Sequence, residues 1–199
     1  MRLSIQIHRP MRLLSLNTGR VQPLLVQGQT HVSGIRKAPC EGRVAVAPLG
    51  LEGDEQADLT VHGGLSKAVY AYPQAHYAFW QTVRAQAKVA GWDEPLAPGA
   101  LGENLTLDGF VEQDAWVGDV LRFPDCELAV SEPRQPCFKF NAVMGFNQAA
   151  KLMSRSGWCG FYLAVLKPGT LQAGEAFELV PGPREVSIAE LFRARVRRD

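Results

Sequence analysis

The chain has 199 residues, of which 46% are hydrophobic and 21% are charged, a balance typical of globular proteins. A chain of this length buries roughly two-thirds to three-quarters of its unfolded surface, so its core needs neither a structural metal nor a disulfide. Its net charge of +1 creates no general field that attracts nucleic acid or anionic lipid, and we expect neither partner.

The four cysteines form no C-x-x-C pair of the kind used by zinc or dithiol redox sites. Cys126 and Cys159 lie in apolar surroundings that predict core positions, whereas Cys40 lies beside a proline in a loop-like segment. No signal peptide is recognisable, and no apolar run is long enough to span a bilayer. We therefore expect reduced thiols, a cytoplasmic location and no membrane insertion.

Short apolar runs separated by glycine and proline dominate the sequence and predict strands joined by tight turns. Regular punctuation of this kind indicates a mostly β fold that closes, wholly or in part, into a barrel. The predicted strands cover residues 12–19, 42–50, 67–73, 103–109, 119–125, 127–133, 161–169 and 176–182.

Three segments have the pattern of helices. The first begins at Pro73, which suits a first helical turn, and its apolar positions recur at helical spacing until Gly91. The second has Asn147 as its predicted N-cap and Gly157 as its stop signal. The third begins at Ser187, which is followed three residues later by a glutamate, as in a capping box, and runs toward the C-terminus.

Two clusters allow more than one interpretation. Aromatic side chains around the first helix either stack a flat heterocycle or, as we favour, pack that helix against the sheet. They are Tyr70, Tyr72, Tyr77, Phe79 and Trp80. Basic side chains near the C-terminus either contact phosphate or are simply solvated. They are Arg193, Arg195, Arg197 and Arg198.

The segment SEPRQPCFKFN places Cys137 in a basic, proline-rich run. A lone cysteine is most often a small buried hydrophobe. A thiolate, however, is the form that binds metals or attacks electrophiles, and Arg134 and Lys139 would favour it. Pro133 and Pro136 force an irregular backbone that can hold the sulfur on a rigid loop. Both interpretations of Cys137 stay open at this point.

The glycine-rich segment 50–67 contains Asp54, Asp58, His62 and Lys67. Its glycines let the backbone approach a ligand closely, and the HGG triplet could present backbone donors to an anion beside a lysine. The alternative is a pair of turns with solvated charges. The sequence contains no P-loop or dinucleotide-binding fingerprint.

Two further residues are weak candidates by themselves. Asn104 in GENL is either a turn residue or an amide that hydrogen-bonds a ligand. Lys37 in SGIRKAPCEG is an ordinary solvated lysine unless other features support a binding role.

These elements occur together and in order, and in that combination the chain resembles the MOSC domain, the module named for the C-terminal part of molybdenum-cofactor sulfurases. Within that family it resembles the YiiM-like branch. The motifs extend from about Met11 to Val180. The resemblance implies a MOSC-type β-barrel with a few peripheral helices and a short C-terminal helix. We expect an upstream extension at 1–10, the barrel domain at 11–182 and a shortened helical appendage at 183–199.

The resemblance also implies a bound molybdenum cofactor, Mo-molybdopterin, whose metal is ligated by Cys137. Lys37 matches a lysine near the pterin phosphate, and Asn104 matches an asparagine close to the metal with a catalytic role. His62 is the expected proton donor of the reaction. Asp54, Lys67 and Arg134 also match recurring motif positions, which either bind the cofactor or support the barrel. We expect Lys139, a cation near Cys137, to bind the cofactor as well.

The implied activity is an oxidoreductase reaction that is independent of pyridoxal phosphate. It reduces N-hydroxylated bases, such as hydroxylaminopurines, and N-hydroxylated amidines, and so detoxifies them. The sequence contains no flavin or iron–sulfur motif, so the electrons would come from an external flavoprotein reductase. A homodimer is compatible with the resemblance. Two other functions stay open: a sulfur-carrier or cofactor-handling protein with a persulfide on Cys137, and a β-barrel binding module without catalytic activity.

Overall fold

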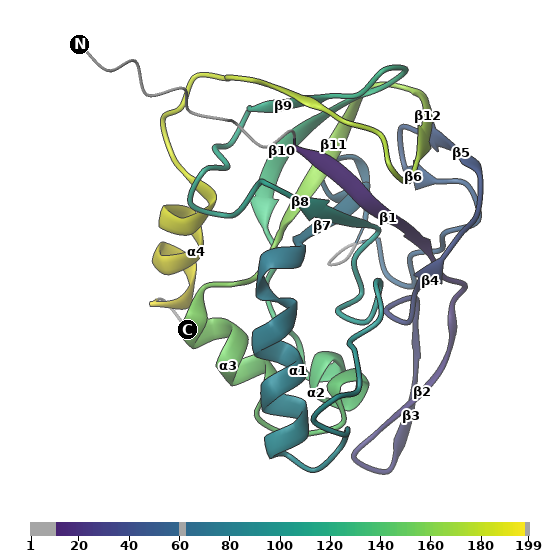
Figure 1. Cartoon of the computed structure of the whole chain (residues 1–199), viewed down its shortest axis with the longest axis vertical. Helices are drawn as coiled ribbons and strands as arrows, with labels where there is room; N and C mark the ends of the chain where they lie inside the picture. Colours follow the sequence, from purple (N-terminus) through teal and green to yellow (C-terminus); the bar gives the residue numbers. More distant parts are fainter. Residues whose placement is uncertain (1–10, 60–62, 198–199) are drawn as a thin grey trace.

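The computed structural model describes residues 11–59 and 63–197 and shows a strand-rich fold flanked by helices (Figure 1). Its strands are β1 Arg12–Thr18, β2 Gln22–Val26, β3 Gln29–Ser33, β4 Ala38–Pro39, β5 Arg43–Ala47, β6 Gly50–Leu51, β7 Val69–Pro73, β8 Leu105–Asp108, β9 Val120–Arg122, β10 Glu127–Pro133, β11 Phe161–Lys167, β12 Gly169–Gln172 and β13 Glu178–Val180. Its α-helices are α1 Tyr77–Gln86, α2 Phe138–Met144, α3 Ala149–Ser156 and α4 Ile188–Val196. Two 3-10 turns, η1 Leu65–Lys67 and η2 Gln74–His76, flank β7.

Eight strands form the central sheet in the order β13-β9-β10-β11-β7-β8-β1-β4. The pairs are antiparallel except β7 and β8, which run parallel and are connected through α1. A three-stranded sheet, β12-β5-β6, and the β2–β3 hairpin complete the β structure. All eight strands predicted from the sequence are present.

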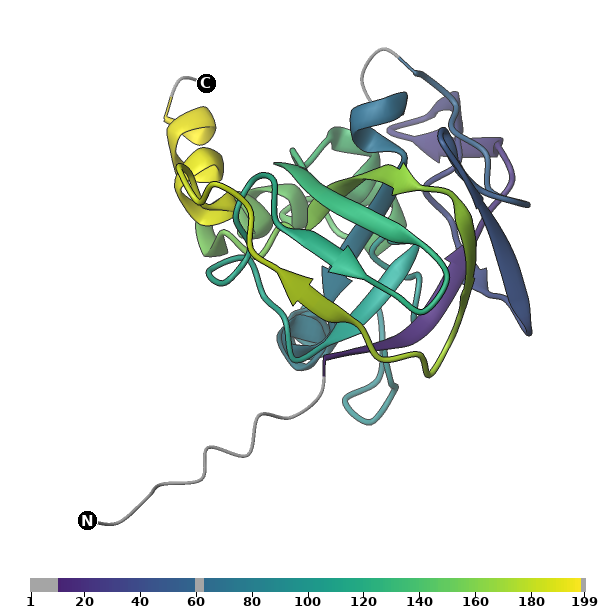
Figure 2. The same cartoon turned by 90° about the horizontal axis from the view of Figure 1, so that it is seen from above.

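The two ends of the central sheet approach each other as the sheet curls (Figure 2). Arg12 of β1 forms an isolated antiparallel bridge with Ala176, and the Leu13 amide donates to the Glu175 carbonyl at 2.9 Å. The sheet order nevertheless begins with β13 and ends with β4, which are not paired in the described part of the chain. The closed barrel therefore stays a prediction, whereas the mostly β fold is confirmed.

Buried apolar residues form two clusters. The first fills the concave side of the sheet and includes Leu13, Leu105, Leu128 and Phe161, all 0% exposed. The second packs helices α1 to α3 against β7 and β11. In that second cluster the predicted aromatic packing of α1 is confirmed, because Trp80 is fully buried and its indole N–H donates to the Tyr72 hydroxyl at 2.6 Å.

The first helix is shorter than predicted. Pro73 is the last residue of β7, where it lies opposite Leu107 of β8, and a 3-10 turn separates it from α1. The helix ends at Gln86, before Gly91, because Lys88 has a left-handed backbone with φ of 58°. Pairing with a neighbouring strand thus overrode the local preference of Pro73 for a helical turn.

The second predicted helix is one half of a helical hairpin, α2–α3, and α2 itself was not predicted. The predicted N-cap at Asn147 is wrong, because the N-cap of α3 is Gln148. The backbone N–H of Ala150, in the first turn of α3, donates to Asn141 Oδ1 of α2 at 2.8 Å. A cap supplied by another helix leaves no local sequence pattern. Gly157 ends α3 in a left-handed conformation, as predicted.

The capping box at Ser187 is confirmed at the start of α4, where the Glu190 amide donates to Ser187 Oγ. Helix α4 lies beside α3 (Figure 1). Among the described helices, none combines the length and apolar character that a membrane crossing requires.

Candidate functional site

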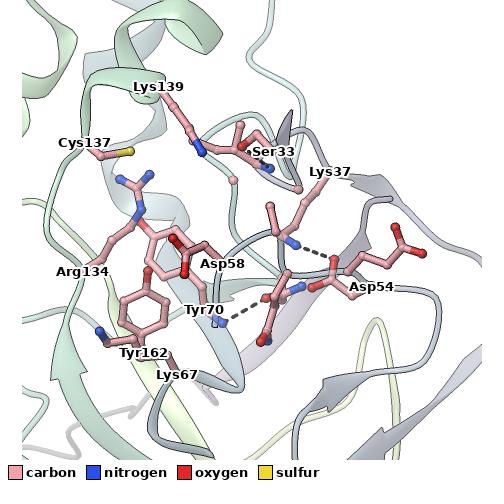
Figure 3. A pocket seen from close by; sticks show the side chains of 17 residues that line it. Ser33, Lys37, Asp54, Asp58, Lys67, Tyr70, Arg134, Cys137, Lys139 and Tyr162 are labelled. Carbon is pink, nitrogen blue, oxygen red and sulfur yellow. Dashed lines mark hydrogen bonds and ion pairs between the residues drawn. The ribbon is translucent and has the colours of Figure 1, made fainter. Parts of the chain in front are cut away.

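A pocket opens where the β2–β3 hairpin, the loop after β6, the end of β10 and the start of α2 meet (Figure 3). It contains most of the site residues predicted from the sequence, although they are spread over about a hundred positions. Its predicted members are Lys37, Asp54, Lys67, Asn104, Arg134, Cys137 and Lys139. His62, the predicted proton donor, lies outside the described residues.

Cys137 is held between an irregular loop and a helix. The loop 134–137 follows β10, as predicted, and Cys137 is the N-cap of α2, with φ of −119° and ψ of 166°. Its side chain is partly exposed and forms no disulfide. In Figure 3 its sulfur faces the guanidinium of Arg134, whose positive charge favours a thiolate.

Arg134 is a buried cation, only 3% exposed, at the wall of the pocket. Its guanidinium carbon lies 5.1 Å from the centroids of the Tyr70 and Phe140 rings, and its Nη1 donates to Met153 Sδ at 3.3 Å. In the described residues no carboxylate forms an ion pair with it. A guanidinium held by ring faces keeps its charge available to an anion such as a thiolate or a phosphate.

Lys37 and Asp54 form a buried ion pair on the opposite side of the pocket (Figure 3). Their side chains are 7% and 3% exposed, and Asp54 also accepts the Gly19 amide at 2.9 Å. Burial lowers the pKa of Lys37 from its ordinary value of 10.5, and the charge of Asp54 partly offsets this effect. Asp54 therefore orients the lysine, whose remaining donors can serve a ligand.

The Asn104 side chain joins two strands at the pocket floor. Its Oδ1 accepts the Tyr70 amide at 3.0 Å, and its Nδ2 donates to the Asn17 carbonyl at 3.1 Å. Because both ends of the amide are bonded to backbone, the structure gives Asn104 a clear role in joining β1 to β7. Its catalytic role stays a prediction.

Two further lysines lie at the rim of the pocket. Lys139 on α2 donates from Nζ to the Val32 carbonyl at 3.0 Å, which ties α2 to the β2–β3 hairpin. Lys67 Nζ lies 3.9 Å from Glu132 Oε1, and the other oxygen of Glu132 accepts from Arg195 of α4 at 2.7 Å. The C-terminal helix is thus connected to the pocket through one carboxylate.

Two tyrosines and a second aspartate also line the pocket: Tyr70, predicted to stack a heterocycle or to pack the first helix, Asp58 of the glycine-rich segment, and Tyr162, which the sequence did not single out. The rings of Tyr70 and Tyr162 lie 5.5 Å apart and form one wall next to Arg134. Asp58 faces the same space in Figure 3. Tyr162 sits inside a strongly apolar strand that predicted only core, so no local signal marked it.

Two glycines allow the loops that form the pocket to pack closely. A Cβ at Gly34 would lie 2.1 Å from the Glu55 carbonyl oxygen. Gly102 has φ of 86°, and a Cβ there would lie 2.8 Å from Ile35 Cγ1. Any larger residue would push these loops apart, so the two glycines maintain the shape of the pocket.

The remaining cysteines do not line this pocket, although the Cys159 carbonyl accepts the Tyr70 hydroxyl at 2.8 Å. Cys126 and Cys159 are buried in the two hydrophobic clusters, as predicted. Cys40 packs against the first cluster, and its thiol donates to the Leu16 carbonyl at 3.1 Å.

The donor set of the pocket fits a cofactor that carries its own metal and a phosphate. A single thiol and several cations face one cavity, and thiolates suit soft metals whereas arginine and lysine suit phosphates. Across residues 11–59 and 63–197, no group of three or more His, Cys, Asp or Glu side chains could hold a metal ion by itself. A metal bound beside Cys137 would take its other ligands from a cofactor.

Comparison with known proteins supports one family. A profile of the MOSC domain matches residues 58–178. The chain is 36% identical to Protein YiiM of Escherichia coli over 174 residues, which covers 87% of this chain and 74% of YiiM. It is 32% identical over 197 residues to a protein of Gibberella moniliformis named Reductase, covering 94% of this chain and 33% of that protein.

Solved structures agree with this result. The crystal structure of YiiM from Geobacillus stearothermophilus superposes with a TM-score of 0.74 at 30% identity, covering 95% of this chain and 85% of that one. The chain therefore belongs to the MOSC domain family, and its relatives include YiiM-type proteins.

Proposed function

We propose that this protein is a molybdenum-cofactor-dependent reductase of N-hydroxylated bases and amidines. The observation that carries the proposal is the placement of the Cys137 thiol against a buried arginine, in the same pocket as three lysines. Membership of the MOSC family supports an association with the molybdenum cofactor, and a relative named Reductase supports an oxidoreductase.

In this proposal Cys137 supplies a thiolate ligand to the metal, and Arg134 stabilises its negative charge. Lys37, oriented by Asp54, binds the terminal phosphate of the pterin, while Lys67 and Lys139 add positive charge at the rim. When bound, the cofactor supplies the two-electron chemistry that ordinary side chains lack.

The net reaction converts R–NH–OH, two electrons and two protons into R–NH2 and water. The N–O bond breaks, one added proton goes to the hydroxyl, which leaves as water, and the second added proton goes to nitrogen, which receives the electron pair. His62 is the proposed proton donor. The ring faces of Tyr70 and Tyr162 provide a wall on which a flat heteroaromatic substrate can be oriented.

The electrons require a second protein in this proposal. We propose an external flavoprotein reductase as the donor and the cytoplasm as the site of action, with a homodimer as the proposed assembly. Under this proposal the purified protein is therefore inactive with NADPH alone and active with a chemical reductant such as reduced viologen.

An anaerobic assay tests this function. Protein expressed in a host that makes the molybdenum cofactor is mixed with 6-hydroxylaminopurine or an amidoxime and reduced viologen, and loss of substrate is followed chromatographically. We expect turnover with molybdenum-loaded protein and none with molybdenum-free protein. Absence of turnover from fully loaded protein with every substrate of this class would contradict the proposal.

A sulfur-carrier function is the second candidate, because the Cys137 sulfur is partly exposed in a pocket and forms no disulfide. A persulfide on Cys137 would add the mass of one sulfur atom after incubation with a cysteine desulfurase and cysteine. Transfer of that sulfur to an acceptor, without reductase activity, would favour this candidate.

A further inference from the structure

A second cavity lies on the helical side of the molecule, between α3 and α4, which run beside each other in Figure 1. Its volume is about 480 Å³, which is within the range of small-molecule sites. No residue of this cavity belongs to the Cys137 pocket. We call it the α3–α4 cleft.

Three exposed arginines line the α3–α4 cleft: Arg155 at the end of α3, and Arg193 and Arg197 on α4. None of them forms an ion pair with a carboxylate in the described part of the chain. Arg195 differs, because it is bound to Glu132 on the other side of α4. Of the four C-terminal arginines, Arg195 is therefore structural, Arg193 and Arg197 line the cleft, and Arg198 lies outside the described residues.

Among the described residues that line the cleft, the one acidic side chain, Glu112, is bonded to groups inside the protein. Glu112 is buried, one of its oxygens lies 2.8 Å from His76 Nε2, and the other accepts the Gly160 amide at 2.7 Å. Within residues 11–59 and 63–197 no carboxylate therefore neutralises the arginine charges in the cleft, and these residues form a local positive site on a protein whose net charge is only +1.

The walls of the cleft are apolar and fixed. Phe192 is buried, Val196 lies one turn further along α4, and the Trp158 ring stacks on His76 with centroids 4.6 Å apart and planes 8° apart. An aromatic and aliphatic surface of this kind suits the organic part of a ligand.

The arginines that line the cleft come from two helices. Arg193 on α4 and Arg197 at the C-cap of α4 are four residues apart, so their Cβ atoms lie roughly 6 Å apart, and Arg155 approaches from α3. Guanidinium groups that come from two helices can share the oxygens of one or more phosphate groups. Arginine is also the residue best suited to phosphate oxygens.

We propose that the α3–α4 cleft binds a small organic molecule that carries one or more phosphate groups. Helix-terminal arginines also stabilise helices through the macrodipole, which accounts for a basic residue at each helix end. That effect requires neither the cavity nor the convergence of arginines from two helices.

Calorimetric titration of the full chain with ADP, pyrophosphate and inorganic phosphate tests the proposal. We expect one ADP site per chain with a Kd below about 100 µM, and inorganic phosphate at least about tenfold weaker. Arg193→Gln/Arg197→Gln should weaken ADP binding at least about tenfold. The matched control Lys151→Gln/Lys167→Gln removes two exposed charges outside the cleft and should change the affinity for ADP less than about twofold.

Three results would overturn the proposal. One is the absence of saturable ADP binding, and another is an equal loss in the control variant, which would indicate diffuse charge attraction. The third is loss of binding in Lys37→Gln with retention in the cleft variant, which would place the anion in the Cys137 pocket. If the double variant does not fold, the single variant Arg155→Gln, at an exposed residue of α3, provides the same comparison.

A competition arm separates a small ligand from a protein partner. A glutamate-rich peptide should not displace ADP at equal charge concentration. Displacement by the peptide at lower concentration would show that the cleft recognises an acidic polypeptide and would contradict the small-ligand proposal.

Discussion

The Cys137 pocket and the two hydrophobic clusters place a cysteine thiol in opposite environments. In the core, burial raises the pKa of Cys126 to about 12, and burial also raises the pKa of Cys159 well above its ordinary value. In the pocket, Cys137 is partly exposed and faces a buried guanidinium. The comparison teaches that the surroundings of a thiol, not its residue type, decide whether it can serve chemistry.

Thiol alkylation should show the largest difference between the two regions. At pH 8 and with iodoacetamide, we expect Cys137 to be modified at least about a thousandfold faster than Cys126 and Cys159, because only a thiolate reacts. Since the folded-state pKa of Cys126 is about 12, its reaction should become appreciable only near that pH or after unfolding. Peptide mass spectrometry measures each rate.

Equal rates for the buried and pocket thiols in folded protein would contradict this comparison. Cys40, whose thiol donates to the Leu16 carbonyl, should react at an intermediate rate.

Cys137→Ser should remove reductase activity by at least about a hundredfold while leaving the fold intact, because a hydroxyl is a poorer ligand for soft metals than a thiolate. The matched control is Cys126→Ser, which should leave turnover nearly unchanged and destabilise the protein by about 1–3 kcal/mol. Viologen-driven turnover and urea unfolding measure the two effects. Normal turnover in Cys137→Ser would show that this sulfur is not a catalytic ligand.

Removal of one partner from the buried Lys37–Asp54 pair should destabilise the protein strongly. Asp54→Asn leaves a buried ammonium without its carboxylate, and we expect a loss of about 3 kcal/mol in the free energy of unfolding. Arg20→Gln breaks the ion pair between Arg20 and Glu55, whose side chains are 74% and 41% exposed, and should change the free energy of unfolding far less than Asp54→Asn does.

Urea denaturation measures both variants. If Asp54→Asn is as stable as the wild type, the pair is not a structural unit. Recovery of stability in Lys37→Met/Asp54→Leu would show that the unpaired charge, rather than the lost contact, caused the effect.

The smallest expected effect concerns the connection from α4 to the pocket. Arg195→Gln removes the 2.7 Å ion pair with Glu132, which also lies near Lys67. We expect a loss of about 0.5–1 kcal/mol in stability and an approximately two- to threefold weaker retention of pterin. Arg193→Gln on the same helix should not change pterin retention, and an equal effect of both variants would argue against the connection.

The sequence was sufficient for features determined by local pattern. Short apolar runs between glycine and proline located eight of the strands, and the serine–glutamate spacing located the start of α4. The ordered motifs also identified seven pocket residues, since the family resemblance connects positions that no local rule connects.

The rest depends on contacts between distant parts of the chain. The hairpin β2–β3 is rich in glutamine and lacks a strong apolar alternation, so it was not predicted. The burial of Lys37 follows from its meeting with Asp54 across 17 residues. Tyr162 enters the pocket only because β11 packs beside β10 and β7, which no pattern within β11 records.

The central claim is that the Cys137 pocket holds a molybdenum cofactor, and the molybdenum and pterin content of the purified protein tests it most directly. Protein from a cofactor-competent host is analysed by mass spectrometry for metal and by fluorescence for oxidised pterin, with Cys137→Ser and Cys126→Ser in parallel. The account predicts close to one molybdenum and one pterin per wild-type and Cys126→Ser chain, and a clear loss of molybdenum in Cys137→Ser. Wild-type protein that contains neither molybdenum nor pterin, or a Cys137→Ser variant that keeps both in full, would contradict it.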